Sequence, residues 1–446
     1  MSGTGITPNR RAVGWNVQFT IGRNTKPQAF AGIYQVPDSD LVTFRDVCDE
    51  LCLCFEFPDD SAREGKCDNG HSDNPWASTA FALTDPPDLP SSEVRGLSFV
   101  IGNLLDRPVP SLQPISSKEQ NVIKYHLVLH KACNLPCSSP LDTHLKRCAR
   151  HLSEPIRRYD PRYLPPNEVP SDPKLSMMPF RQTLTAGSAK RSSSGSIPPA
   201  KQSLDNSEDT GFDNMLAPKD VEIDRDAAKR RVDYFRSSCL DSADHCAVTG
   251  LGKPWCTGFP IGPAIQACHI IPQIHYHLYP SGEDDDEDIA TVYDSPRKLL
   301  LAWHNTWDPK NGILLKNDLH ECFNAGLFSI HPHTLRIRVF VPYDVLTPFN
   351  GKKASVPSST DWRALQHHYE MCCIENMAAK KPYSLTISPS VTRRALGSGT
   401  SSALSPRTDL PPTPEQIDPT QRLSPLSPQE RKIRQSGPVI VLPVKK

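Results

Sequence analysis

The chain has 446 residues, which at roughly 100 to 200 residues per domain allows two or three folded units. Its formal net charge is +0, so the molecule as a whole is not a strongly basic nucleic-acid binder, and any such binding must be local. The 45 prolines and a hydrophobic fraction of 37% predict that a sizeable part of the chain is linker rather than core.

No stretch of the sequence resembles a signal peptide, and none approaches the ~20 apolar residues that span a bilayer. We therefore expect a soluble intracellular protein that is not bound to a membrane. A short basic cluster at Lys229 favours the nucleus over the cytoplasm.

With 14 cysteines and no secretory signal, we expect thiols that are reduced, buried or metal-bound rather than joined in disulfides. The amino-terminal cysteines lack the paired Cys-x-x-Cys spacing of a structural zinc site, so burial as small apolar side chains is the preferred interpretation there. The cysteines considered are Cys48, Cys52, Cys54, Cys133 and Cys137.

Residues 1–155 contain short runs rich in β-branched and aromatic residues, separated by Pro, Gly and Asp. The runs are VGWNVQFTI, FAGIYQV, RGLSFVI and KYHLVLH. They predict a mostly β domain of unknown role. A closing helix is predicted over 141–152, where Leu145, Cys148 and Leu152 have helical spacing.

Two segments, 156–220 and 381–446, are rich in Pro, Ser and charged residues and cannot bury enough apolar area to offset the entropy of ordering. They are predicted to be a disordered linker and a disordered tail. Between them, IDRDAAKRRVDYFRSSC predicts a basic helix, and a capped stretch that begins near Trp362 predicts a packing helix in a carboxy-terminal extension, 346–380. The apolar face of the basic helix is predicted to be Ile223, Ala227, Val232 and Phe235.

The stretch QACHIIP reads as a short strand that presents His269 at its end. About forty residues later, NGILL predicts a turn and a second strand, and NDLHECFNAG predicts a helix capped by Asn317 or Asp318 and ended by Gly326. LFSI and LRIRVFV predict a closing hairpin. The expected order is strand, long loop, strand, helix.

On the predicted helix, His320 and Asn324 are four residues apart, so they share a face and can bind the same ion. The neighbouring face is apolar and would anchor the helix on the hairpin. Its residues are Leu319, Phe323 and Leu327. The polar pair is then expected to point at the strand that carries Cys268 and His269.

This ordered combination resembles the HNH endonuclease domain, in the form found in fungal HNH nuclease domain-containing proteins. The matching pieces are CAVTG at Cys246, HIIP at His269, NGILL at Asn311 and LHECFNAGLFSI from Leu319. The resemblance implies an α+β fold class, with an HNH (ββα-metal) module over 221–345 that follows the mostly β domain.

The resemblance further implies that His269 is the general base for hydrolysis and that Asn311 braces its loop. His320, with Cys268 and Asn324, is then expected to bind one divalent metal ion. Cys268 and Asn324 stand where the family often has Asp or His, and a set without carboxylates suits zinc or another soft ion better than magnesium. Magnesium, manganese, zinc and nickel all remain open.

The family generally cuts DNA, which makes DNA the expected partner; no protein partner of the amino-terminal domain is indicated. Basic residues near the motif are candidates for phosphate contacts, or alternatively an ordinary solvated surface. They are Lys229, Arg230, Arg231, Arg236, Lys310 and Lys316. The acidic loop beyond His275 and His277 is interpreted as a solvated insertion rather than a second ion site.

Two rival interpretations stay open. One is an inactive HNH-like module that serves as a binding scaffold. The other is a purely structural zinc site formed by Cys246, Cys256, Cys268 and His320.

Overall fold

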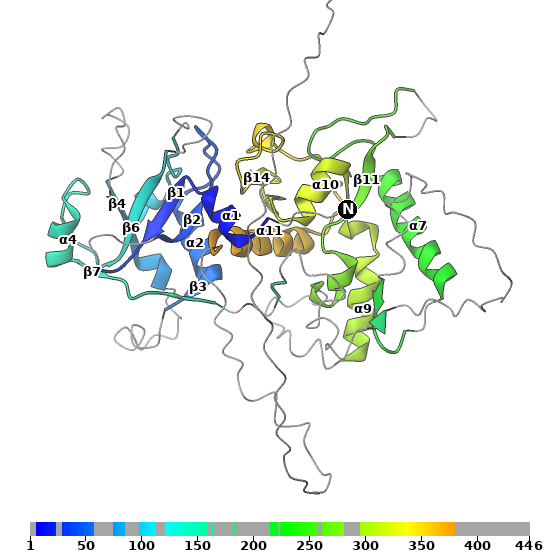
Figure 1. Cartoon of the computed structure of the whole chain (residues 1–446), viewed down its shortest axis with the longest axis horizontal. Coiled ribbons are helices and arrows are strands. Elements are labelled where there is room, and N and C mark those ends of the chain that lie inside the picture. Colours follow the sequence, from blue (N-terminus) through cyan, green and yellow to red (C-terminus); the bar gives the residue numbers. More distant parts are fainter. Residues whose placement is uncertain are drawn as a thin grey trace, which may run out of the picture. The chain divides into compact units, whose positions relative to one another are not determined.

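A six-stranded sheet organises the amino-terminal part of the chain (Figure 1). The strand order is β2-β1-β6-β4-β5, with β7 also pairing with β6; β1 and β6 run parallel, and the other pairs are antiparallel. The strands are β1 (Val17–Thr20), β2 (Ala29–Ile33), β4 (Thr79–Thr84), β5 (Phe99–Val100), β6 (Ile123–His130) and β7 (Ala149–His151). The structure, a computed structural model, describes residues 6–23, 29–57, 75–84, 98–112, 121–158, 160, 162–164, 182–183, 215–221, 224–256, 261–280 and 295–379.

Helices accompany this sheet, so the prediction of a mostly β domain is not confirmed: the described part of the chain is α+β. The other elements here are α1 (Pro8–Val13), α2 (Phe44–Cys54), β3 (Phe55–Glu56), η2 (Pro75–Ser78), η4 (Gly102–Asp106), α4 (Leu141–Arg147) and β8 (Ile156–Arg157). Helix α2 begins at a capping box in which Thr43 and Asp46 satisfy each other's backbone amides. It packs on the sheet through Phe44, whose ring lies 5.1 Å from Phe81 and 5.2 Å from Tyr125.

The predicted helix over 141–152 is shorter than expected. Helix α4 ends at Arg147, Cys148 already has a non-helical backbone, and the next residues form β7 on the edge of β6. The helical spacing of Leu145, Cys148 and Leu152 was therefore misleading, because pairing with β6 takes over after Cys148.

The second half of the described chain has the predicted order of strand, long connection, strand and helix, followed by the predicted antiparallel hairpin. Its elements are α7 (Arg225–Ser242), β11 (Ile265–His269), η5 (Gln273–Leu278), α9 (Pro296–Thr306), η6 (Pro309–Asn311), β12 (Gly312–Lys316), α10 (Asn317–Asn324), β13 (Phe328–Ile330), β14 (Ile337–Val339), η7 (Thr347–Phe349) and α11 (Trp362–Met377). A short pair, β9 (Gln182–Thr183) and β10 (Leu216–Ala217), precedes them. Helix α9 was not predicted; the acidic block at 281–294 lies outside the described residues.

Helix boundaries match the sequence signals only in part. Helix α10 has Lys316 at its N-cap with no side-chain cap, so the prediction that Asn317 or Asp318 caps it is wrong. Its end is as predicted, with Gly326 at φ +64° just after the C-cap Ala325. In the basic helix α7 the buried residues are Ala228, Phe235 and Cys239, so Ala227 was placed one position early; Ile223 lies outside the described residues.

Helix α11 joins the two halves of the fold. It contacts α1, α2, β2 and β13. Arg11 of α1 lies 3.0 Å from a carboxylate oxygen of Glu375 on α11, and it donates a 2.7 Å hydrogen bond to the carbonyl of Ala325 at the end of α10. Because buried charges need their partners, the second half is completed by side chains from the first, and the described residues lie in one compact unit, Met1–Leu385.

Most of the predicted disordered linker and the whole tail at 381–446 lie outside the described residues. The domain boundaries given above remain predictions. In the part of the chain that is described, no helix is long and apolar enough to cross a membrane.

Candidate active site

Strands β11 and β12 place the motif residues on two faces of one ladder. They pair antiparallel, with Cys268 opposite Ile313 and His269 opposite Gly312. Successive side chains of a strand point to opposite faces. Accordingly, Cys268 faces helix α10, whereas His269 faces helix α7.

His269 lies between two aromatic rings. Its imidazole stacks on Phe235 of α7, with ring centroids 3.9 Å apart, and meets Trp307 edge-on at 5.1 Å. Nε2 is shielded from solvent and has no hydrogen-bond partner. Burial, and then the charge of His320, lower the pKa of His269 to about 3, so its imidazole is neutral at physiological pH, as a proton acceptor must be.

Gly312, across the ladder from His269, allows α7 to approach this closely. A Cβ built there would collide with Sγ of Cys239 and lie 3.0 Å from Cζ of Phe235. The glycine of the NGILL motif is thus required by the packing of the helix that carries the ring stacked on His269.

Asn311 holds the backbone that follows His269. Its Oδ1 accepts from the amide of Ile271 at 3.0 Å, and its Nδ2 donates to the carbonyls of Ile271 at 2.9 Å and Thr306 at 3.0 Å. Its own carbonyl accepts from the amide of Ile270 at 2.8 Å. The side chain is fully buried, and this geometry is what a bracing role requires.

Replacing Asn311 with alanine should lower the free energy of unfolding by about 1–3 kcal/mol for each backbone group left unpaired. Urea unfolding of the full chain measures this. Asn317→Ala, at an exposed position on α10, is the matched control and should stay within about 0.5 kcal/mol of the wild type. Equal stability of the two variants would contradict the bracing role.

The predicted metal ligands lie on the opposite face of the ladder. Sγ of Cys268 is 3.9 Å from Oδ1 of Asn324, and Nδ1 of His320 is 3.1 Å from Oε1 of Gln266. Burial raises the pKa of the Cys268 thiol well above its ordinary value and lowers the pKa of His320. Because Nδ1 of His320 contacts Gln266, Nε2 of the same ring is the nitrogen that could bind an ion.

By their chemical type, these donors suit a soft ion better than magnesium. Two ligands of one tetrahedral zinc ion lie ~3.6 Å apart, close to the spacing between Cys268 and Asn324. Thiolate, imidazole and amide oxygen are a soft to intermediate set, whereas magnesium prefers carboxylate and water oxygens. Among the described residues, no group of three His, Cys, Asp or Glu side chains converges at this motif.

The interpretation of this region as a structural zinc site is wrong. Cys246, Cys256, Cys268 and His320 are all described, and they do not form a group that could hold a metal ion. His275 and His277 do not form one either, and His277 is buried in the connection after β11.

The basic residues predicted to contact phosphate differ in exposure and in their contacts within the protein. Lys229, Arg230 and Lys310 are exposed, and Arg236 is partly exposed. Arg231 is held by the protein: it lies 3.1 Å from Nδ1 of His304, with its guanidinium 4.4 Å above the Trp303 ring. The Lys316 ammonium is 3.5 Å from a carboxylate oxygen of Asp318.

A surface hollow next to His269 gathers two of these arginines. It is lined by Ala227, Arg230, Arg231, Tyr234, His304, Trp307, Asp308 and Pro309. Trp307 also forms the edge of the ring pair around His269. The hollow therefore brings positive charge to the side of the histidine that faces α7.

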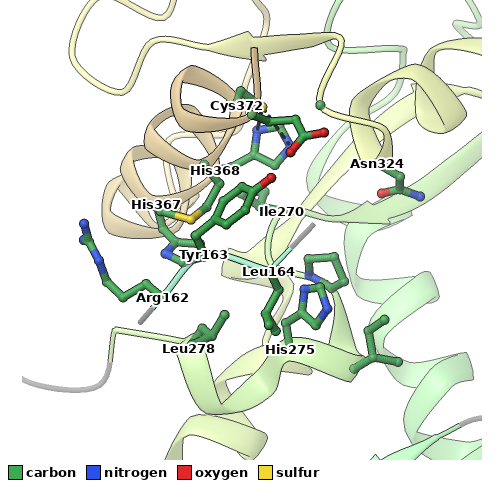
Figure 2. Close-up of a pocket in the computed structure, with 15 residues that line it drawn as sticks. Arg162, Tyr163, Leu164, Ile270, His275, Leu278, Asn324, His367, His368 and Cys372 are labelled. Atoms are coloured by element: carbon green, nitrogen blue, oxygen red, sulfur yellow. Dashed lines mark hydrogen bonds between the residues drawn. The ribbon is translucent and has the colours of Figure 1, made fainter. Parts of the chain in front are cut away.

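A separate cavity of about 260 Å³ lies beside Asn324. Figure 2 shows Asn324 on one side of it and the imidazoles of His367 and His368 of α11 on the other. Its arginine, Arg162, is paired with Asp160 and Glu370, so the cavity offers little charge to a phosphate. The nearby histidine His368 braces α10 through a 3.2 Å contact with the carbonyl of Phe323.

The side chains that surround the motif residues were not predicted from the sequence. Phe235 and Trp307 enclose His269 from α7 and from the end of α9, and only the fold brings them together. Gln266 could have been found, because it lies two residues before Cys268 and therefore shares its strand face.

Two antiparallel strands followed by a helix, with a histidine at the end of the first strand and donors along the helix, define a ββα nuclease-like module. Residues 246–331 match the family model described as HNH endonuclease. The chain thus contains a domain of the HNH endonuclease family over these residues, which confirms the predicted HNH resemblance; its likeness to fungal proteins stays a prediction. No curated protein and no solved structure matches the chain.

Proposed function

We propose that the protein is a metal-dependent endonuclease that hydrolyses DNA phosphodiester bonds with His269 as general base. The observation that carries this proposal is the match of residues 246–331 to the HNH endonuclease family, together with the unpaired Nε2 of His269 at the end of the motif strand. A neutral imidazole accepts a proton from water, and this increases the nucleophilicity of that water toward phosphorus.

The residues at and around His269 have separate proposed roles in the reaction. Nε2 takes the proton of the attacking water, while Asn311 keeps the backbone of Ile270 and Ile271 in place behind the base. Nε2 is shielded in the free protein, so the attacking water would reach it only once substrate is bound, as is common for catalytic contacts. Arg230 beside the hollow would bind the phosphate backbone and set its register.

The metal ion would be bound close to His269, whose pKa responds to the charge of His320 on α10. His320, Cys268 and Asn324 are the proposed ligands, with Gln266 orienting the His320 ring. A soft divalent ion there, zinc or nickel rather than magnesium, would supply Lewis-acid stabilisation of charge on the phosphate. Binding requires Cys268 to lose its proton, which its burial opposes.

A second candidate function is an inactive HNH-like module that binds a partner without cutting it. One observation favours it: the ligand set contains a fully buried thiol and no carboxylate. In this case the motif would preserve the fold around β11, β12 and α10 rather than a reaction.

The test of the proposal is nicking of supercoiled plasmid by the full-length chain with zinc, nickel, manganese or magnesium supplied in turn. The full chain is needed because Arg11 completes the packing around α10 and α11. We expect nicking to be fastest with zinc or nickel and to be lost in His320→Ala, but not in Asn317→Ala. A folded protein that nicks with none of the four ions would favour the binding module.

A further inference from the structure

Four metal-ligating side chains converge at one end of the amino-terminal sheet, far in sequence from the HNH motif. They are His130, Cys133, His144 and Cys148, and one ligand atom from each lies within 4.8 Å of all the others. Among the described residues, this is the one group of three or more His, Cys, Asp or Glu side chains arranged to hold an ion.

The spacings within the group are those of a tetrahedral metal site. Nε2 of His130 is 3.3 Å from Sγ of Cys133, and Nδ1 of His144 is 3.2 Å from Sγ of Cys148. A nitrogen and a sulfur bound to one zinc ion lie ~3.6 Å apart in tetrahedral geometry. A shift of a few tenths of an ångström in the side chains would admit the ion.

The backbone brings the two pairs together. His130 ends β6, and Cys133 follows in the loop; His144 lies on α4, and Cys148 caps it one turn later on the same face. Pairing of β6 with β7 sets His130 opposite Ala149, and the amide of Lys131 donates to the carbonyl of Cys148 at 2.8 Å.

The surroundings hold the histidines in place. His144 is fully buried and stacks on Phe99, with ring centroids 3.9 Å apart, and His130 meets the edge of the same ring at 5.6 Å. Cys148 is buried and Cys133 partly buried, and both thiols are free of disulfides. Two imidazoles and two thiols, one of each buried and one of each partly buried, are a donor set that zinc prefers.

We propose that His130, Cys133, His144 and Cys148 bind one structural zinc ion. Four protein ligands close the coordination shell and leave no position for a substrate, so the ion would secure the loop between β6 and α4 rather than act in catalysis. The sequence here has no Cys-x-x-Cys pair; its pattern is His-x2-Cys followed by His-x3-Cys. The proposal does not depend on the proposed nuclease activity.

The first test is the zinc content of the full-length protein, purified with zinc present and measured by mass spectrometry of the metal. Cys133→Ser/Cys148→Ser should lose one molar equivalent relative to the wild type, whereas Cys137→Ser should lose none. Cys137 is the matched control because it lies in the same loop but outside the group. To exclude zinc bound at the HNH motif from the count, the same variants are compared in a protein that already carries His320→Ala.

A second measurement keeps the proposal testable if the double variant does not fold. Cobalt substituted into the His320→Ala protein should give the intense visible bands of tetrahedral cobalt and a thiolate-to-cobalt charge-transfer band. Removal of the ion by a chelator should lower the midpoint of thermal unfolding. Unchanged zinc content in the double variant, a cobalt protein without these bands, or a Cys133–Cys148 disulfide in the purified chain would each overturn the proposal.

Discussion

Replacing His269 with alanine should slow DNA nicking by about 10² to 10⁴-fold, the usual contribution of a positioned general base. The side chain is the proposed acceptor of the proton from water, and no other described titratable group shares its position between Phe235 and Trp307. His333→Ala removes an exposed histidine near β14 and is the matched control, with a rate expected within twofold of the wild type, roughly the scatter of neutral surface changes.

The dependence of the rate on pH tests the protonation state inferred for His269. Burial lowers the pKa of His269 to about 3, so the neutral form persists as the pH falls through the ordinary histidine value of ~6.5. The wild-type rate should therefore show no loss centred at that value. Equal nicking rates for His269→Ala and His333→Ala would contradict the assignment of the base.

Replacing Glu50 with alanine should lower the free energy of unfolding by about 3–5 kcal/mol, because it leaves a buried charge without its partner. Glu50 of α2 forms an ion pair with Arg338 of β14, including a hydrogen bond of 3.0 Å from Nη2. The Glu50 and Arg338 side chains are 4% and 2% exposed. In an ion pair as buried as this, removing one partner strongly destabilises the fold. Tyr369 of α11 also accepts from Arg338 at 2.7 Å.

Two comparisons make this stability prediction specific. Asp106→Ala removes the partner of Arg45 in a pair that is 53% and 62% exposed, and it should leave the free energy of unfolding close to that of the wild type. The double variant Glu50→Leu/Arg338→Met, which removes both charges, should recover most of the loss. Urea unfolding in which Glu50→Ala matches Asp106→Ala would contradict the account of how the two halves are joined.

The sequence predicted the parts of the fold whose signals are local. The strand that ends at His269, the hairpin β13–β14 and the helix end at Gly326 follow from short apolar runs and turn residues. The HNH resemblance was confirmed for a related reason, because each of its motifs is a short run and the motifs follow one another in a set order.

The rest depends on contacts between distant segments. Nothing in the run of residues around Phe235 shows that its ring stacks on His269, and the ion pair of Glu50 with Arg338 spans 288 positions. After Cys148 the chain forms β7 and pairs with β6, although the spacing of its apolar residues is helical. The proposed metal group was not found from the sequence, because its two pairs of ligands come together only when β6 pairs with β7. The pairs are His130 with Cys133 and His144 with Cys148.

Plasmid nicking with the metal ion present, removed and restored shows whether the HNH module cuts DNA with the help of a bound ion. Full-length protein is incubated with supercoiled plasmid as purified, after treatment with a chelator, and after zinc or nickel is restored. We expect nicked circles in the first and third samples and intact plasmid in the second. Intact plasmid in all three, with the protein folded and loaded with metal, would contradict this expectation.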